Sequence, residues 1–556
     1  MPHKKRRKKR IKYGRILVLL VMIGLIIYGG SIIVNGIKNI KTVEYYLANT
    51  SPNVTLFSYN SDDDIIEEID KLPRGTKVTS HNKNKTIKDL NYIEIKVDEN
   101  KYYVLEDNLV QDKKDVVKEK DKYVRTSVTV YQNEKDSKIE SFIKKGNIIE
   151  IIDYNSIDSS GKVNMYKIKK DDIEGWVYEK YLVDTEEEAK ANYNENGVYD
   201  KHKNRKFSYE LYGGKASTLD YYPFEKPSFE DNKLLEVAKT MYLNGSAEVI
   251  RNVDKYVSIA TSSGVNAIVV DIKDGALAYP SEIAKEYSNT AYKSAQNSLE
   301  TYKNAIDKIK EANIYVIGRI VAFNDYHYGV DHKDERIQNT EWVSAYSRGS
   351  WEYNVELAKE AIKTFGFNEI QYDYVRFPEA SYQYSKNNYN FRNTYKEEKA
   401  EAIQNFLFYA ADQIHKEGAY LSVDVFGECS GTYVTSYGQY WPAISNIVDV
   451  ISSMPYTDHF GREVDTWTNA YQTVNNWAKG AAARQKEIPT PAIPRTWVTA
   501  YNTPFWNPTV TYGASKISDQ AKALVDAGLK GGFITWNSRS SLSKYNEIKS
   551  AFAKDY

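Results

Sequence analysis

The alternation of apolar and polar positions divides the chain into three parts. Residues 16–34 form one apolar run without a charge, directly after a dense basic segment at residues 4–15. From about Thr42 to Val183, short stretches of alternating residues lie between clusters of Asn, Asp, Lys and Gly, which is typical of small β-sheets. From about Leu234 onward, apolar strands alternate with amphipathic helices, which indicates a parallel α/β sheet.

The apolar run has the length of a membrane-spanning helix. Because basic residues keep their flank in the cytoplasm, we expect a cytoplasmic tail at 1–15, a transmembrane helix at 16–34 and everything after about Lys38 outside the cell membrane. A cleaved signal peptide is the alternative. The run is long and has no clear Ala-x-Ala cleavage site, although Gly29-Gly30-Ser31 keeps that alternative open.

The β-rich part contains an internal repeat. The segment 101–110 echoes 174–183, and each closes a span of similar length, which predicts modules at 43–112 and 123–184. The Gly-Trp-Val-Tyr step at 175–178, followed by Tyr181-Leu182, resembles the end of a bacterial SH3-like domain. The first copy lacks the Gly-Trp pair and is a degenerate version. The resemblance implies binding to the cell wall, and a rigid spacer is the equal alternative.

The C-terminal part, residues 234–556, follows the charged and Tyr/Pro-rich linker 185–233. Its predicted strands are 240–243, 267–271, 315–322, 369–375, 420–426, 448–454, 490–497 and 532–536. Helices are predicted at 298–312, 352–365, 395–416, 467–484 and 515–527. About eight strand–helix units in about three hundred residues predict a closed (β/α)8 TIM barrel. A doubly wound sheet is the alternative, but no Gly-rich phosphate loop follows the first strand.

Polar side chains recur where the predicted strands end. Aspartate is disfavoured in strands and costly to bury, and in a barrel the carboxyl ends of the strands meet at the mouth that holds the active site. The pattern therefore predicts an acidic pocket lined by aromatic rings. The candidate residues are Asp271, Lys273, Arg319, Asp373, Arg376, Asp424, Glu428, Tyr456, Asp458, Trp497, Trp536 and Asn537.

Composition narrows the choice of partner. Lys+Arg and Asp+Glu are both 75, so no global positive charge favours nucleic acid. The single cysteine excludes an internal disulfide and a cysteine-rich zinc site. The 48 tyrosines and 9 tryptophans suit the stacking of sugar rings, although they also serve ordinary cores. We expect no cofactor and no bound metal.

Four segments carry a family resemblance. They are 266–274, 319–325, 370–378 and 422–427, of which Gln-Tyr-Asp-Tyr-Val-Arg-Phe-Pro at 371–378 is the most specific. Together they resemble the bacterial glycoside hydrolase family known as domain of unknown function 4015. The resemblance covers about 234–556 and implies a barrel related to carbohydrate-active enzymes, with a polysaccharide or oligosaccharide substrate.

A catalytic hypothesis follows for a membrane-anchored, extracytoplasmic glycosidase acting on cell-wall or other polysaccharide. Hydrolysis of a glycosidic bond needs one carboxyl as acid and another carboxylate as nucleophile or base. Asp373 is the candidate for the ionised group, kept charged by Arg376, and Asp424 or Glu428 is the acid. The remaining candidates would bind substrate, although Asp271 and Arg319 could instead form a structural ion pair.

Two other functions stay open. A sugar-binding barrel without catalysis, displayed on the cell surface, fits an aromatic mouth equally well. A metal-dependent polysaccharide deacetylase would need histidine ligands beside an aspartate, and only His327, Asp331 and His332 lie near a suitable strand end.

Overall fold

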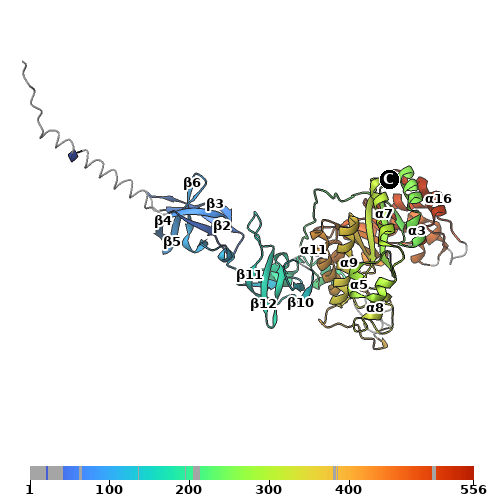
Figure 1. Cartoon of the computed structure of the whole chain (residues 1–556), viewed down its shortest axis with the longest axis horizontal. Helices are drawn as coiled ribbons and strands as arrows, with labels where there is room; N and C mark the ends of the chain where they lie inside the picture. The colour runs from blue at the N-terminus through green and yellow to red at the C-terminus, as the bar shows by residue number, and fades with distance from the viewer. Residues whose placement is uncertain are drawn as a thin grey trace, which may run out of the picture. The chain divides into compact units, whose positions relative to one another are not determined.

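The computed structural model describes residues 21–22, 42–61, 65–135, 137–194, 196–204, 213–379, 384, 386–461, 463–503 and 509–556 (Figure 1). The chain divides into two compact units. The first contains Met1–Asp121 and Glu150–Lys167, and the second contains Lys122–Ile149 and Ile168–Tyr556. Apart from Val21 and Met22, the predicted transmembrane helix at 16–34 lies outside the described residues. In the described ranges, no helix combines the length and apolar character needed to cross a membrane.

The N-terminal region is all β, and its two sheets share one topology. The first sheet has the order β3-β2-β6-β5-β4-β1-β7 and the second β10-β9-β13-β12-β11-β8-β14, so each strand corresponds to the one seven places later. The two sheets thus repeat one strand order, while the module bounds and the SH3-like assignment stay predictions. The first sheet consists of β1 (Val43–Leu47), β2 (Asn53–Asn60), β3 (Ile65–Pro73), β4 (Lys77–Ile87), β5 (Leu90–Val97), β6 (Asn100–Leu105) and β7 (Leu109–Val110). The second consists of β8 (Asp121–Val124), β9 (Val128–Tyr131), β10 (Ile139–Ile143), β11 (Ile148–Tyr154), β12 (Met165–Lys170), β13 (Ile173–Tyr178) and β14 (Leu182–Val183).

The C-terminal region contains nine parallel strands in its described part, and their sheet is nearly barrel-shaped. We call it the barrel-like sheet. Its strands are β16 (Ala238–Leu243), β17 (Ala267–Asp274), β19 (Tyr315–Val321), β20 (Glu369–Asp373), β21 (Tyr420–Phe426), β23 (Val450–Met454), β24 (Ile493–Pro494), β25 (Thr496–Thr499) and β26 (Gly532–Trp536). The last strand, β26, pairs with the first, β16. Only Arg495 separates β24, which pairs with β23, from β25, which pairs with β26.

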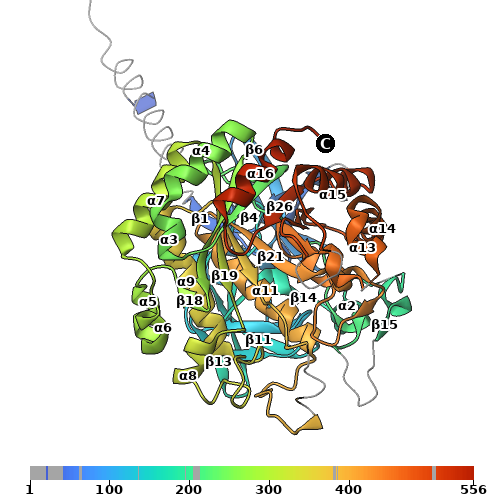
Figure 2. The same ribbon diagram turned by 90° about the vertical axis from the view of Figure 1, so that its right-hand side faces the viewer.

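Helices follow the strands, as the sequence predicts, and Figure 2 shows them arranged around the strands β19, β21 and β26. The principal helices are α4 (Val253–Ser263), α7 (Leu299–Glu311), α9 (Arg348–Phe365), α11 (Lys399–Lys416), α14 (Ala470–Gln485), α15 (Ala514–Asp526) and α16 (Leu542–Phe552). Helix α7 illustrates how the local sequence forms these helices. Its Ser298 side chain caps the first turn, and Tyr302, Ala305, Ile306 and Ile309 are buried on one face at helical spacing.

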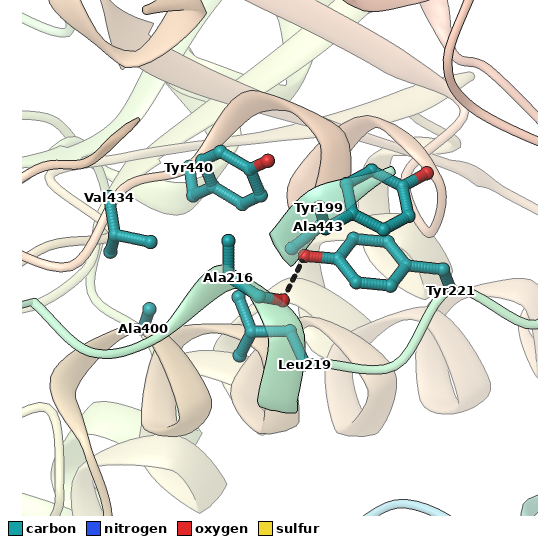
Figure 3. Packing of buried hydrophobic residues seen from close by; sticks show 8 residues of the cluster. All are labelled: Tyr199, Ala216, Leu219, Tyr221, Ala400, Val434, Tyr440 and Ala443. Atoms are coloured by element: carbon teal, nitrogen blue, oxygen red, sulfur yellow. Dashed lines mark hydrogen bonds between the residues drawn. The ribbon is translucent and has the colours of Figure 1, made fainter. Parts of the chain in front are cut away.

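Part of the segment predicted as a linker packs on the barrel-like region. Glu186–Ala191 forms the short helix α2, and further along the chain the rings of Tyr199 and Tyr221 stack with centroids 3.5 Å apart. Figure 3 shows Tyr221 donating a hydrogen bond to the carbonyl of Ala216, at 2.5 Å, within a buried cluster. Apolar side chains from α11 and from the region after β21 complete that cluster. These residues belong to the second compact unit.

Strands β9 and β10 of the second repeat contact helices of the same unit. The Tyr131 ring stacks on Tyr409 of α11, with centroids 6.1 Å apart. Tyr181, between β13 and β14, donates a 2.8 Å hydrogen bond to Asp412 of the same helix. The backbone N–H of Ile139 donates to Glu352 of α9 at 2.6 Å. This part of the repeat is thus attached to the barrel-like region by buried contacts.

Candidate active site

The side chains of the site share one face of the barrel-like sheet. Alternate residues of a strand point to the same side, so Asp271 shares a face with Ala267 and Val269, and Arg319 shares a face with Ile317. The apolar members of these sets lie in one buried cluster with Tyr242, Trp497 and Ile534. The polar members lie in the carboxyl-terminal half of their strands. The strand sequence therefore places an apolar core below and charged groups above it.

Arg319 is the centre of the charged group. Its guanidinium donates to Asp271 at 2.7 Å, to Asp274 at 3.3 Å and to Asp373 at 2.6 Å. Its Nε atom lies 3.6 Å from a carboxylate oxygen of Asp424. Burial alone would lower the pKa of Arg319, but the neighbouring aspartates raise it well above its usual range. One cation thus contacts four carboxyl groups, and all of them except Asp274 are buried.

Asp424 is the most deeply buried of these carboxyls, with 1% of its surface exposed. Burial raises its pKa well above the usual range, and the nearby charge of Asp373 raises it further. The indole of Trp497 donates to one carboxyl oxygen at 2.7 Å. The other oxygen has no hydrogen-bond partner among the described residues. Both effects favour the protonated form of the Asp424 carboxyl.

Asp271 is a second carboxyl with a shifted pKa. Burial raises its pKa to about 6, against the opposing effect of Arg319. The hydroxyl of Tyr242 donates to its second oxygen at 2.5 Å. Asp271 therefore has both of its oxygens engaged by protein groups. That arrangement suits a residue that positions Arg319.

Tyr374, directly after Asp373, has a strained backbone. Its φ is 54°, in the left-handed region that few residues other than glycine adopt. Its N–H donates to Asp373 at 2.6 Å. This conformation explains why β20 ends at Asp373 rather than at Val375 as predicted. Such strain costs about 1–3 kcal/mol and clusters at functional sites.

Two adjoining cavities open above this group. The smaller has a volume of about 340 Å³ and the larger about 750 Å³. Both are lined by Glu379, Phe426, Met454 and His459, so the two cavities adjoin. The smaller cavity is further lined by Asp274, Arg319, Asp373, Tyr374, Arg376, Tyr456, Trp497, Tyr501 and Trp536. Aromatic rings and carboxylates thus lie together in the lining of the smaller cavity.

Several predicted site residues thus lie together around the smaller cavity, but Lys273 does not. A β-bulge between Asp271 and Lys273 shifts the register with β19, so the period of two fails there. The ammonium of Lys273 is buried instead against Asp325, at 2.5 Å, and Asn354, at 2.8 Å. Lys273 therefore forms a structural ion pair and lines neither cavity.

Arg376 has a different place from the one expected. The direct partner of Asp373 is Arg319, whereas the Arg376 guanidinium lies against the rings of Phe426, at 4.4 Å, and Tyr374, at 4.9 Å. Burial lowers the pKa of Arg376. Arg376 still lines the smaller cavity. Closeness in the sequence favoured Arg376 as the partner of Asp373. In the structure the partner is Arg319, which lies on the neighbouring strand.

The other predicted residues divide into lining and supporting groups. Tyr456, Trp497 and Trp536 line the smaller cavity. Asp458 accepts a 2.7 Å hydrogen bond from Tyr501, and the Asn537 amide donates to the carbonyl of Ser541 at 3.2 Å. Neither Asp458 nor Asn537 lines a cavity. Glu428 lines the larger cavity only.

Glu379 was missed by the sequence reasoning. It lies one residue after Pro378, at the end of the most specific family segment, and it lines both cavities. The strand-end pattern does not include Glu379, because this residue lies beyond the end of β20. The signal for this residue in the sequence was a glutamate in the loop that follows β20.

The candidate metal ligands have other partners. A ring nitrogen of His327 lies 2.7 Å from the carbonyl of Gly275, and one of His332 lies 2.7 Å from that of Tyr287. Asp331 accepts hydrogen bonds from Ser288 and Thr290. Within the described ranges, no group of three or more His, Cys, Asp or Glu residues could hold a metal ion.

Comparison with known proteins decides the family. Residues 240–542 match the profile of the family described as "Putative glycosyl hydrolase domain" (DUF4015). The chain belongs to this glycosyl hydrolase family. The match spans all of the barrel-like sheet from Thr240 onward, together with the whole group around Arg319. A comparison with curated proteins finds no match.

Three solved structures illustrate more distant likenesses. A hypothetical protein from Ruminiclostridium thermocellum is 33% identical over 33% of this chain and 97% of its own, with a TM-score of 0.27. The glycoside hydrolase domain of PgaB (BpsB) from Bordetella bronchiseptica is 10% identical over 58% and 100%, with a TM-score of 0.42. A class V chitinase from Pseudomonas fluorescens is 12% identical over 57% and 99%, with a TM-score of 0.37. Because these TM-scores are low, only the family match supports the assignment of a function.

Proposed function

We propose that the chain is a membrane-anchored, extracytoplasmic glycosidase with a (β/α)8 barrel, which cleaves a cell-wall or other polysaccharide through a pair of carboxyl groups. The observation that carries the proposal is the contrast between Asp373 and Asp424. Asp373 lines the smaller cavity and is ion-paired with Arg319, whereas Asp424 is buried and its pKa is raised. Hydrolysis by an acid and a base uses two carboxyls that differ in their environments in this way.

Asp373 is the ionised partner in this mechanism. Its carboxylate attacks the anomeric carbon or removes a proton from the attacking water, while a carboxylic acid protonates the departing glycosidic oxygen. One water is consumed per bond cleaved. Arg319 forms an ion pair with Asp373 and orients its carboxylate. The strained turn at Tyr374 fixes the carboxylate further through its N–H.

Asp424 is the carboxyl that we propose as the acid, because burial and the charge of Asp373 raise its pKa and so favour its protonated form. Glu379 is the second candidate, because it lines the same cavity as Asp373 whereas Asp424 is covered. Substrates with an activated leaving group need no protonation. Loss of the true acid should therefore reduce their cleavage much less than that of natural glycosides. Comparing Asp424→Asn with Glu379→Gln on both substrate types identifies the acid.

The test of the activity itself is the release of reducing ends. The full chain is incubated with a panel of bacterial wall polysaccharides and other glycans, in parallel with its Asp373→Asn variant. The proposal expects release from at least one glycan by the wild type and a strong loss in the variant. If the panel yields binding but no cleavage, the chain is a non-catalytic sugar-binding protein, the alternative that the aromatic lining also fits.

The membrane topology is tested separately. The charge asymmetry around 16–34 supports a cytoplasmic N-terminus with both β repeats and the barrel-like region outside the cell membrane. Protease added to intact protoplasts should remove the barrel-like region. Full protection of that region, with the protein still in the membrane fraction, would reject the topology.

A further inference from the structure

The larger cavity has a lining of its own that the catalytic proposal leaves unexplained. With about 750 Å³, it is in the size range of a complete ligand pocket. Among the described residues, five Phe, Tyr or Trp side chains line it: Phe426, Tyr433, Tyr437, Phe460 and Trp477. Two carboxylates, Glu379 and Glu428, also line it. No lysine or arginine of the described chain is among its lining residues.

Glu428 is held in a defined position at this cavity. It lies in the short turn Gly427–Ser430 that follows β21. The hydroxyls of Tyr433 and Tyr437 donate to its two carboxylate oxygens, each at 3.0 Å. Trp477 donates to the carbonyl of Gly427 at 2.8 Å and so fixes the turn itself. The carboxylate is thus presented by groups that also form the wall of the cavity.

The chemistry of this lining distinguishes between sugars. Aromatic faces attract the apolar face of any sugar ring, so they do not select by charge. A cation above an aromatic ring and beside a carboxylate gains from both contacts. An anionic sugar would meet two like charges in the same cavity, which disfavours its binding. The lining therefore favours a sugar unit that carries a positive charge.

We propose that the larger cavity is a substrate subsite that selects a sugar unit with a free amino group, and that Glu428 is its specificity-determining residue. The inference rests on the proposed function, because the subsite adjoins the cavity that Asp373 lines. It names the substrate class as a polymer containing amino sugars that are not N-acetylated. Glu428 then binds the ammonium group and does not donate the proton for cleavage.

The experiment measures binding in the full chain carrying Asp373→Asn, so that turnover does not intervene. The probes are glucosamine oligomers, N-acetylglucosamine oligomers of the same length and linkage, and galacturonic acid oligomers, each titrated calorimetrically at neutral pH and low salt. We expect the glucosamine oligomers to bind about tenfold or more tightly than the acetylated ones, and the galacturonic acid oligomers to bind weakest. A tenfold change corresponds to about 1.4 kcal/mol. The preference should decrease with added salt.

Variants assign the preference to Glu428. Adding Glu428→Gln should remove most of the preference while binding of acetylated oligomers changes little, because Gln keeps an oxygen acceptor for a tyrosine hydroxyl. Tyr437→Phe should reduce the preference by a smaller factor, since one contact that orients the carboxylate is lost. Glu311→Gln, an exposed change on α7 that lines neither cavity, should leave it unchanged.

Two outcomes would overturn the inference. One is equal binding of free and acetylated amino sugars, and the other is a preference that survives Glu428→Gln. Failure of the proposed function looks different. In that case the amino-sugar preference is present and depends on Glu428, but the wild type cleaves none of the oligomers. A wild type that cleaves a neutral polymer and shows no charge preference would reject only the subsite.

Discussion

The barrel-like sheet contains two buried arginine networks, and they differ in their balance of charge. Near the amino-terminal ends of the strands, Arg495 lies 2.9 and 3.0 Å from the two oxygens of Glu369, and both residues are fully buried. Arg495 also donates to the carbonyl of Leu235. Near the carboxyl ends, Arg319 faces four carboxyls. Both networks include a residue of β20, Glu369 at its start and Asp373 at its end.

This difference in charge balance separates a structural ion pair from a candidate catalytic group. Arg495 and Glu369 form a pair of one cation and one carboxylate, and they line neither cavity. A structural role is therefore sufficient to explain this pair. The Arg319 network has an excess of carboxyls, raised pKa values for Asp271 and Asp424, and an open cavity beside it. Burying more carboxyl groups than cations lowers the free energy of unfolding. Such an arrangement is typical of functional sites, where shifted pKa values cluster.

The largest effect should come from breaking the matched pair. Arg495→Met leaves Glu369 buried without its cation, which we expect to cost about 3–5 kcal/mol of unfolding free energy. Thermal or denaturant unfolding of the full chain measures this cost. The matched control adds Glu369→Leu, which should recover most of the loss because an apolar pair needs no compensation. An unchanged stability in the single variant would remove the contrast between the two networks.

Asp373→Asn should have the opposite signature. The substitution keeps the size of the side chain and removes the charge that stabilises the oxocarbenium-like transition state, so turnover should fall by a factor of about 10²–10³. Unfolding should change far less than in Arg495→Met. Asp274→Asn is the control, because Asp274 lines the same cavity and contacts the same arginine. Since Asp274 is half-exposed, this substitution should reduce turnover much less. Equal losses in both variants would contradict the assignment.

The raised pKa of Asp271 predicts a pH-dependent stability. Because its folded pKa of about 6 lies above its ordinary value of 3.8, the folded state binds the proton more tightly, and its contribution is present at low pH and lost as pH rises to about 6. The shift corresponds to about 3 kcal/mol. Relative to Asp271→Asn, the wild type should therefore lose stability between about pH 4 and 6 and then level off. Parallel curves for the two proteins would contradict the raised pKa.

The smallest effect concerns the proton on Asp424. Trp497→Phe removes a hydrogen bond that stabilises the charged form of this carboxyl, and such a bond contributes about 1 kcal/mol. The pKa of Asp424 should then rise further. If Asp424 is the acid, the alkaline limb of the pH–turnover profile moves to higher pH. A limb that stays in place points to Glu379 as the acid.

The sequence predicted the order of strands and helices because apolar periodicity is local. The period of two also placed Asp271, Arg319 and Asp373 at one end of the sheet. It failed for Lys273, where a bulge reverses the side chain, and it could not foresee that Arg319, from a neighbouring strand, pairs with Asp373. The packing of Tyr199 and Tyr221 within the expected linker depends on tertiary contacts that no local pattern encodes.

The most direct test of the account is a pair of crystal structures soaked with one oligosaccharide that the wild type cleaves. In the Asp373→Asn variant, we expect an intact chain that passes through both cavities, with one glycosidic bond beside position 373. In wild-type crystals, the same soak should leave a shortened product ending there. An intact oligosaccharide in both crystals, or one bound away from the Arg319 network, would contradict the claim that this network is the catalytic site.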